Sequence, residues 1–454
     1  MNPDISSISK SSSVRLAGIF QPAPAADFEI TDPAEIASEY RRWQRRVLFS
    51  SIIGYATFYF VRKNLSIAMP YMERGLGIQK TQLGLFLTMH GLLYGVSKFA
   101  NGFLGDRANA RVLMVSGLAM SAILNVLFGF SSTVIALGII WTLNGWFQGM
   151  GFPPCARLMA NWFAPKQLAT KFSLWNMSHP IGGGLIVVIC GYLVGMNWRL
   201  CFFIPAALAM ACAVFLWFSL PDTPPSVGLP ELEGTGSSAS AATKKETSKE
   251  FRLFVYEHVF RNTFIWIVSF ANFFVYIIRY AVLDWGPTLL TESKHIKITH
   301  AGWMVAGFEF FGLFGAVVGG WLTDKYFGGR AVRVCLIYML LAGVSVFLFW
   351  RIPGQSEIST AALLGAAGFF IYGPQCLLAV AAANLATRKA AATAIGLTSI
   401  FGYASTVLSG WGLGALVQHY GWNAAFAGLI IVAGFGSLLF ALGWGAKAHG
   451  YGND

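Results

Sequence analysis

Two basic residues, Arg62 and Lys63, lie deep inside the first long apolar stretch of the chain, Leu48 to Met69. A stretch of that length is typical of a transmembrane helix. Insertion scales assign a cost of about 2.5–3.5 kcal/mol to a cation at the centre of such a helix, so an ionisable residue there indicates a functional site. Arg279 closes a second apolar stretch, 264–278, about half the chain length further on. We therefore expect two arginines, one in each half of the chain, to meet at a central anion site.

Both arginines could instead be structural. Arg62 could extend toward the membrane interface, but at 1.5 Å per residue it lies about 21 Å along the helix from Leu48, too far to reach the interface easily. Arg279 could simply pair with Asp284. Five residues apart on one helix, those side chains would point about 140° apart, which disfavours the pair.

Other polar and aromatic side chains recur at helical spacing in the apolar segments. Residues three or four positions apart share one face of a helix. These groups are Tyr55, Tyr59 and Arg62; His90, Tyr94 and Lys98; Trp175 and His179; and Tyr276 and Arg279. The aromatic residues could equally serve helix packing, and Lys98 is close enough to a helix end to reach the interface. Guanidinium groups bind phosphate or carboxylate oxygens in bidentate fashion, so the set predicts a small organic anion, with a phosphate dianion favoured over a monocarboxylate.

The composition indicates an integral membrane protein. Of 454 residues, 56% are hydrophobic and 11% charged, whereas soluble domains have about 25% charged residues. The formal charge of +12 comes mostly from short loops, which indicates topology rather than nucleic-acid binding. The six cysteines occur singly with no CxxC motif, so we expect packing roles and neither a metal nor a cofactor.

Apolar segments of about 20 residues predict twelve transmembrane helices rather than a β-barrel. Their approximate ranges are 47–69, 83–104, 111–130, 134–156, 169–195, 199–219, 260–283, 301–322, 332–351, 359–385, 391–417 and 422–444. An even number places both termini on one side of the membrane. Basic residues precede the first helix and recur in the loops on that side, so we expect both termini in the cytoplasm.

The chain is expected to form two bundles of six helices. Met1 to about Ser38 contains no apolar run and predicts a disordered tail, and Pro221 to Lys249 predicts a flexible linker. The expected units are a cytoplasmic tail (1–46), a first bundle (47–220), a cytoplasmic linker (221–258), a second bundle (259–445) and a second cytoplasmic tail (446–454).

The two halves resemble each other at a nearly fixed offset. The sequence GFLGDR at 102–107 matches GWLTDK at 320–325. The corresponding loop charges are Asp106 and Arg107, and Asp324 and Lys325. Parallel six-helix repeats with this loop motif resemble the major facilitator superfamily, in which substrate binds between the halves near the midplane and the halves rock to give alternating access. The expected fold is an all-α membrane protein with two parallel six-helix repeats.

A wider set of motifs resembles the organophosphate:phosphate antiporter family of that superfamily. The similarity runs from about Tyr40 to Gly443. The motifs are VRKN (61–64), YGVSKF (94–99), GDRANAR (105–111), GWFQGMGFPPCAR (145–157), WN followed by H and GGG (175–184), RYAVLDW (279–285) and YGPQ (372–375). The resemblance implies exchange of a phosphorylated small molecule for inorganic phosphate without covalent chemistry, so we do not expect an enzyme.

The resemblance implies roles for individual residues. Arg62 and Arg279 match the family's two phosphate-binding arginines, and His179 matches a histidine near the substrate. The implied gating ion pairs, which form and break as the halves rock, are Lys63 with Asp284 and Lys98 with Glu309. The implied aromatic residues of the substrate path are Tyr55, Tyr59, Tyr94, Trp146, Trp175, Tyr276, Tyr372 and Tyr403.

Selectivity is predicted from the segment 391–417. Thr398 occupies a position that is basic in the family's hexose phosphate and phosphoglycerate transporters. Without that extra cation the site favours glycerol-3-phosphate over larger or more anionic substrates. Two departures leave the organic part of the substrate open: Pro180 follows the histidine where relatives have Asn, and Phe308 and Phe310 replace Tyr of the glycerol-3-phosphate branch.

We expect uptake of glycerol-3-phosphate in exchange for inorganic phosphate across the inner membrane of a bacterium. The alternatives are a hexose phosphate (glucose-6-phosphate) transporter, or a sugar phosphate membrane sensor that signals to a partner kinase. Thr398 separates the transporter subtypes but not transporter from sensor. The expected partners are an organic phosphate, inorganic phosphate and the lipid bilayer, with no nucleic acid, and the expected state is a monomer.

Overall fold

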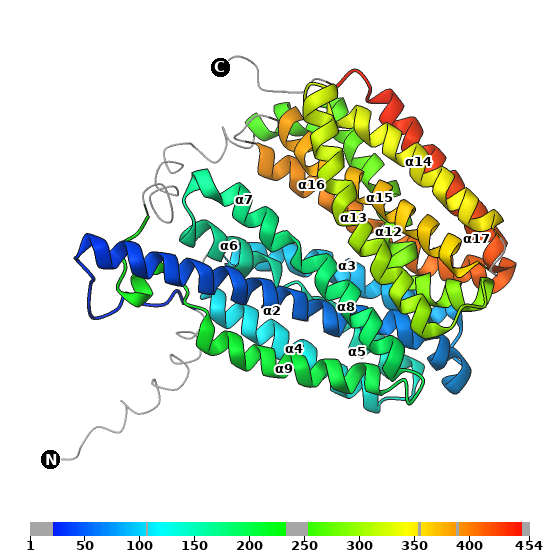
Figure 1. Ribbon diagram of the computed structural model, residues 1–454, viewed down its shortest axis with the longest axis horizontal. Coiled ribbons are helices and arrows are strands. Elements are labelled where there is room, and N and C mark those ends of the chain that lie inside the picture. Colours follow the sequence, from blue (N-terminus) through cyan, green and yellow to red (C-terminus); the bar gives the residue numbers. More distant parts are fainter. Residues whose placement is uncertain (1–20, 106–107, 233–252, 353–355, 387–389, 447–454) are drawn as a thin grey trace.

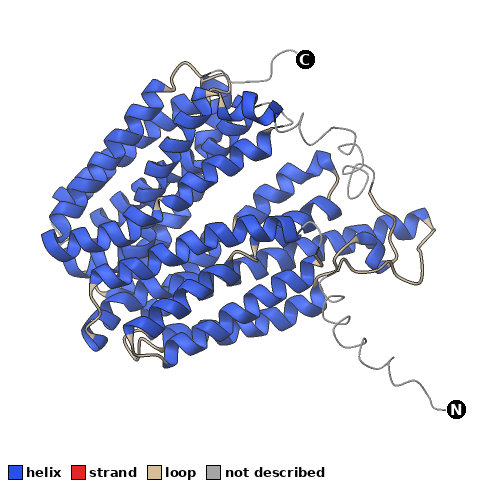
Figure 2. Ribbon diagram, turned by 180° about the vertical axis from the view of Figure 1, so that it is seen from behind, coloured by secondary structure: helices blue, strands red, loops and turns tan. Residues whose placement is uncertain are grey.

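The computed structural model describes residues 21–105, 108–232, 253–352, 356–386 and 390–446. Throughout those residues every regular element is a helix (Figure 2). The first half contains α2 (Pro33–Leu76), α3 (Lys80–Gly105), α4 (Ala110–Phe130), α5 (Val134–Gln148), α6 (Phe152–Trp162), α7 (Pro165–Asn176), α8 (Ser178–Leu193) and α9 (Leu200–Ser219). The second half contains α12 (Thr263–Ser293), α13 (Ile298–Tyr326), α14 (Ala331–Arg351), α15 (Glu357–Leu385), α16 (Ala391–Ala404), the π-helix η5 (Val407–Gly412) and α17 (Leu413–Leu442).

In the described part of the chain these helices form the twelve predicted passes, although some passes are broken. The pairs α5–α6 and α7–α8 each make one pass. In α17 the chain turns back at Gly421, whose φ is +75°, and Leu416 lies 3.4 Å from a Cβ placed on Gly428. Eight of the described helices have the length and hydropathy of membrane spans, and one of these, 393–442, contains the last two passes. The predicted fold class is confirmed.

The first helix begins earlier than predicted. It starts at Pro33 rather than near residue 47, because Asp32 accepts hydrogen bonds from the backbone N–H groups of Ala34 (3.3 Å) and Glu35 (3.4 Å). An Asp cap followed by Pro in the first turn is a strong helix start. The prediction that residues up to about 38 are disordered is therefore wrong for the start of α2.

The segment before α2 is also ordered, because it packs on the start of the predicted linker. The Ala26 N–H donates to the Pro225 carbonyl at 2.8 Å. The Tyr40 hydroxyl donates to the Pro230 carbonyl, and burial is the main cause that raises the pKa of Tyr40 to about 12. Residues 221–232 are thus bonded to the N-terminal segment and do not form a flexible linker, and the rest of the predicted linker, 233–249, lies outside the described residues.

Asp222 connects three parts of the first half. One carboxylate oxygen accepts from the N–H of Ala110, the first residue of α4, at 2.8 Å, and the other accepts from the Ala23 N–H at 2.9 Å. Its carboxylate also lies 3.5 Å from the guanidinium of Arg157 on α6. We call this end of the molecule, where residues 21–32 and 221–232 lie, the linker side.

The two halves touch mainly on the side opposite the linker. Figure 1 shows the two groups of helices meeting at one end and separating toward the linker side. Small residues let the backbones approach there: a Cβ on Gly302 would lie 3.0 Å from the Val187 carbonyl oxygen, and one on Gly84 would overlap the Gly410 carbonyl. Close backbone contact of this kind needs glycine.

Lys80 connects the halves on the side opposite the linker. Its ammonium lies 2.5 Å from the Glu73 carboxylate and 3.0 Å from that of Glu292 in the second half. Glu292 also accepts from the Trp422 indole at 2.8 Å, and the Lys80 N–H donates to the Gln418 side chain at 2.9 Å. Ionic and hydrogen bonds therefore hold the two halves together on this side.

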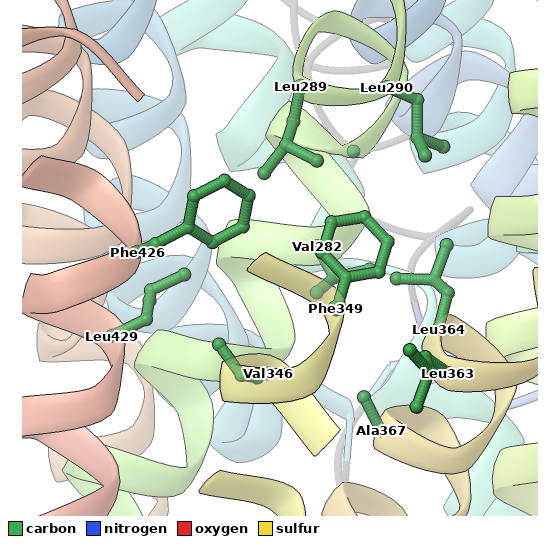
Figure 3. Close-up of a pocket in the computed structure, with 11 residues that line it drawn as sticks. Val282, Leu289, Leu290, Val346, Phe349, Leu363, Leu364, Ala367, Phe426 and Leu429 are labelled. Carbon is green, nitrogen blue, oxygen red and sulfur yellow. The ribbon is translucent and has the colours of Figure 1, made fainter. Parts of the chain in front are cut away.

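The second half contains a small cavity between α12, α14, α15 and α17 (Figure 3). Its volume is about 30 Å³, and its lining is entirely apolar, with Val282, Val346, Phe349 and Phe426 around it. That volume is about the share of one water molecule in the liquid. The cavity is a packing defect and not a ligand site.

Candidate anion-binding site

Arg62 follows a break in α2. Val61 has non-helical backbone angles, φ −100° and ψ 20°. The guanidinium of Arg62 lies over the rings of Tyr94, 4.2 Å from its centre, and Tyr59, 5.3 Å from its centre. Among the described residues no carboxylate lies within 4.0 Å of Arg62. This cation is held by aromatic faces and its charge is not neutralised by a neighbouring acid.

Arg279 is buried on α12, and among the described residues its link to a carboxylate runs through a tyrosine. Its guanidinium donates to the Tyr372 hydroxyl at 3.1 Å, and that hydroxyl in turn donates to the Glu309 carboxylate. The Arg279 Nε has no hydrogen-bond partner among the described residues. Like Arg62, this arginine keeps donor capacity for an anion.

Lys63 and Asp284 form the predicted ion pair across the two halves. The ammonium and carboxylate are 2.5 Å apart, and only 7% and 12% of the two side chains are exposed. The Lys63 ammonium also lies 5.4 Å from the centre of the Tyr280 ring, and the Arg279 guanidinium lies 5.8 Å from the same ring. The basic residues of α2 and α12 therefore face each other across the halves.

The second predicted pair, Lys98 with Glu309, is not formed in this conformation. Lys98 donates instead to the Tyr403 hydroxyl at 3.1 Å and lies 4.0 Å from the centre of the Phe152 ring. Glu309 faces α8 of the first half, where a Cβ on Gly183 would be 3.2 Å from one of its carboxylate oxygens. Both side chains contact the opposite half, but they do so at different places.

Aromatic residues of the first half surround His179. The ring centres of Tyr55, Tyr59 and Trp175 lie 4.7, 5.6 and 5.4 Å from that of the histidine. The histidine Nδ1 is 2.9 Å from the Asn176 carbonyl. A neutral ring that donates from Nδ1 to this carbonyl presents Nε2 as an acceptor, and a protonated ring presents it as a donor.

A chain of rings connects the two arginines. Tyr94 and Tyr403 pack edge to face with centres 5.2 Å apart, and Tyr403 and Tyr276 are 6.5 Å apart. The Tyr276 ring centre lies 5.8 Å from the Arg279 guanidinium. Together with the position of Arg62 over Tyr94, these contacts place both cations on one aromatic surface.

Other predicted site residues make no described side-chain contact with this cluster. Trp146 is 36% exposed, and its ring makes none of the described contacts with the cluster. The Thr398 hydroxyl donates to the Ile395 carbonyl of its own helix at 2.8 Å. Of the loop motifs, Asp324 and Lys325 are exposed at the end of α13. Asp106 and Arg107 lie outside the described residues.

The centre of the molecule carries an excess of positive charge. Four basic side chains, Arg62, Lys63, Lys98 and Arg279, face two carboxylates, Asp284 and Glu309. Charges within transmembrane helices are costly unless they are paired, so an excess of two cations suits an anionic ligand.

The sequence profile of the Major Facilitator Superfamily matches residues 51–410 and 285–449. The chain belongs to the major facilitator superfamily. Its fold agrees with that of a bacterial homologue of the human lysosomal transporter Spinster, solved in an inward-facing and occupied conformation. The TM-score is 0.74 at 15% identity, over 91% of this chain and 99% of that chain. At that identity the likeness concerns the fold alone.

Relatives of this major facilitator are similar over nearly their whole length. A glycerol-3-phosphate transporter of Bacillus subtilis is 36% identical, over 94% of this chain and 98% of its own. A probable hexose phosphate transport protein of Chlamydia pneumoniae is 37% identical, over 94% and 96%. The membrane sensor protein UhpC of Escherichia coli is 36% identical, over 92% and 96%. The predicted resemblance to the organophosphate:phosphate antiporter family is confirmed, and the protein is a transporter-family member and not an enzyme.

Sequence reasoning missed several residues that shape the site of this major facilitator. Three buried asparagines, Asn64, Asn125 and Asn144, surround the break in α2, and Tyr280 lies between Lys63 and Arg279. Tyr280 directly follows Arg279, which was a signal available in the sequence. The asparagines stand in apolar segments, where a polar residue needs a partner.

Proposed function

We propose that this protein exchanges a phosphorylated small organic molecule for inorganic phosphate by alternating access, with glycerol-3-phosphate as the favoured substrate. The observation that carries the proposal is the pair of intramembrane arginines, Arg62 and Arg279, which both keep unused donors in a centre with two excess cations. Guanidinium forks match the oxygens of a phosphate dianion. The names of the relatives support the same class of substrate.

The charge excess gives a physical reason for exchange rather than net flux. In the empty carrier the cations of the two halves repel each other in a medium of low dielectric constant. A dianion between Arg62 and Arg279 would neutralise the excess and allow the halves to close around it. Return of the carrier then requires a second anion, so an outward gradient of phosphate drives uptake of the organic phosphate.

The histidine and the ring surface suit the remainder of such a substrate. With its Nδ1 directed at the Asn176 carbonyl, neutral His179 offers Nε2 to a hydroxyl of the substrate or of a monoprotonated phosphate. Thr398 supplies no charge, and its hydroxyl is bonded within its own helix. A small phosphate ester with few charges is therefore favoured over one with an additional carboxylate.

We further propose that the protein acts as a monomer in the inner membrane of a bacterium, with both termini in the cytoplasm. The basic loops and the position of the N-terminal segment on the linker side support this orientation. The conformation described here would then be open toward the cytoplasm, and the Lys80 contacts would close the outer side.

The test is a counterflow assay. Purified protein in vesicles preloaded with labelled phosphate should release the label when glycerol-3-phosphate is added outside. We expect glycerol-3-phosphate to compete at least tenfold better than 3-phosphoglycerate, which corresponds to about 1.4 kcal/mol. Thr398→Lys should narrow that difference because it adds a cation for the second anionic group. If glucose-6-phosphate is the strongest competitor, the hexose phosphate alternative replaces the glycerol-3-phosphate assignment.

A sensor of sugar phosphate is the second candidate, because the sensor UhpC is as similar to this chain as the transporters are. A sensor needs ligand binding but no rapid exchange. Binding of organic phosphate without counterflow, together with control of a partner kinase, would favour the sensor. Counterflow at many turnovers per minute would favour the transporter.

A further inference from the structure

The residues at the break in α2 do not by themselves explain a kink. Sharp kinks generally arise at Pro, at Gly or Ser pairs, at π-bulges, or where a side chain inserts into the backbone ladder. Val61 has a β-branched side chain, and its neighbours Phe60 and Arg62 are neither Pro nor Gly. The cause must therefore be an interaction with the rest of the bundle.

Two asparagine side chains supply that interaction. The Val61 carbonyl accepts hydrogen bonds from Asn125 Nδ2 of α4 at 3.0 Å and from Asn144 Nδ2 of α5 at 2.8 Å. Asn125 is itself bonded to a third asparagine, since its Oδ1 accepts from Asn64 Nδ2 at 2.8 Å. Asn64 donates in addition to the Cys201 carbonyl of α9 at 2.9 Å. The network thus connects four helices around one turn of α2.

This network is too polar to be explained by stability alone. All three asparagines are completely buried, within segments that span the membrane. Hydrogen bonds between transmembrane helices contribute on average only about 0.6 kcal/mol in double-mutant cycles. What distinguishes asparagine from an apolar residue here is its bond to the Val61 carbonyl, which fixes the position of that carbonyl.

The asparagines would fix the orientation of the two basic residues that follow the break. Successive residues of a helix point about 100° apart, at 3.6 residues per turn. Arg62 is directed at the Tyr94 ring of its own half, and Lys63 at Asp284 of the other half. The rotation of the segment after Val61 decides whether both contacts form together. In α12 no such break precedes Arg279, whose guanidinium is held by Tyr372 instead.

We propose that Asn125 and Asn144 are positioning residues for Arg62, which hold the Val61 carbonyl so that the guanidinium faces the anion in the orientation needed for bidentate binding. This inference rests on the proposed function, because it assigns Arg62 to phosphate. The asparagines act through the backbone and do not touch the ligand.

Asn144→Leu is the most direct test, because the described hydrogen bond of the Asn144 amide is the one to Val61. We expect the half-saturation concentration for phosphate to rise at least tenfold, while the exchange rate at saturation changes less than threefold. Asn144→Gln keeps the amide donor and should recover part of the affinity. The control is Asn101→Leu, since Asn101 is also buried in the first half but its described hydrogen bonds both go to Ser97 of its own helix.

The measurement is phosphate-dependent exchange, with thermal unfolding of each variant measured in parallel. Unchanged half-saturation in folded Asn144→Leu, or an equal rise in Asn101→Leu, would overturn the positioning role. If Asn144→Leu does not fold, Asn125→Leu decides, because it removes the other donor to the Val61 carbonyl: a tenfold rise in half-saturation supports the positioning role, and an unchanged half-saturation overturns it. If the unmodified protein binds no phosphate, the proposed function fails, and this inference fails with it. If the unmodified protein and all variants bind phosphate normally, only the inference fails.

Discussion

The ion pair between Lys63 and Asp284 permits the most quantitative test of the structure. The two groups are 2.5 Å apart, nearly inaccessible, and belong to different halves of the molecule. Removing one member of a buried pair leaves an uncompensated charge, which costs about 3–5 kcal/mol. Replacing both members removes both charges, and apolar replacements of buried pairs are often close to neutral.

We therefore expect Lys63→Met and Asp284→Asn each to lower the free energy of unfolding by about 3–5 kcal/mol, and the double variant to lose less than either single variant. The coupling energy would then exceed about 3 kcal/mol, well above the experimental error of such cycles. The assay is reversible unfolding in mixed detergent micelles, followed by circular dichroism, on all four members of the cycle.

The matched control is Lys325→Met, which neutralises an exposed lysine at the end of α13. Surface substitutions of this kind usually stay within about 0.5 kcal/mol. Strictly additive losses in the double variant would show that Lys63 and Asp284 do not stabilise each other, and the cross-half pairing would be wrong. A large loss in the control would show that the assay reports charge in general and not this pair.

Three further predictions concern the site and the contacts between the halves. Arg62→Lys and Arg279→Lys should each abolish phosphate counterflow without affecting membrane insertion, because lysine keeps the charge but loses the bidentate donors of the guanidinium. Counterflow near the unmodified rate in both variants would show that these arginines are not part of the site. Tyr372→Phe deletes the hydrogen bonds to Arg279 and Glu309, which are worth about 1.5–3 kcal/mol each because the partners are charged. The unfolding midpoint and the affinity for phosphate should both fall. An unchanged affinity would exclude a role for Tyr372 in holding Arg279. Lys80→Met removes two partly exposed ion pairs of about 0.2–1 kcal/mol each. Thr406 of the second half packs against Gly91 of α3, so maleimide labelling of a Thr406→Cys reporter should then increase several-fold. Unchanged labelling would show that Lys80 does not hold the halves together.

The main charges of the site can be recognised in the sequence because each one interrupts an apolar segment. Arg62, Lys63 and Arg279 could be singled out on that basis, and the family resemblance implied the pairing of Lys63 with Asp284. Both the pair and the twelve passes agree with the structure. A charge in an apolar run is a strong signal because its burial must be compensated by a specific partner.

The asparagine network was not predictable in the same way. Asn64, Asn125 and Asn144 are visible as polar residues in apolar segments, but two of them bond to a backbone carbonyl, which has no sequence signature of its own. The early start of α2, by contrast, was marked by Asp32 and Pro33, and it was missed because only apolar residues were counted.

The sequence also indicates ion pairs without indicating the conformation in which each one forms. Lys98 bonds to Tyr403 and Glu309 bonds to Tyr372 here, so the predicted Lys98–Glu309 pair remains a prediction for another arrangement of the halves. If charged residues exchange partners between two conformations, one sequence carries the pairs of both conformations.

The unequal strength of the contacts between the halves indicates which of them would limit the proposed rocking. The glycine contacts of Gly84 and Gly302 involve no side chain of their own and can separate at little cost in rotamer entropy. The Lys80 ion pairs are partly exposed and contribute about 0.2–1 kcal/mol each. The buried Lys63–Asp284 pair is larger, because separating it leaves charges with a desolvation cost of several kcal/mol. Under the proposed function, an anion bound next to Lys63, at Arg62, would compensate that ammonium when Asp284 moves away, so substrate binding and release of the strongest cross-half contact would be coupled by charge.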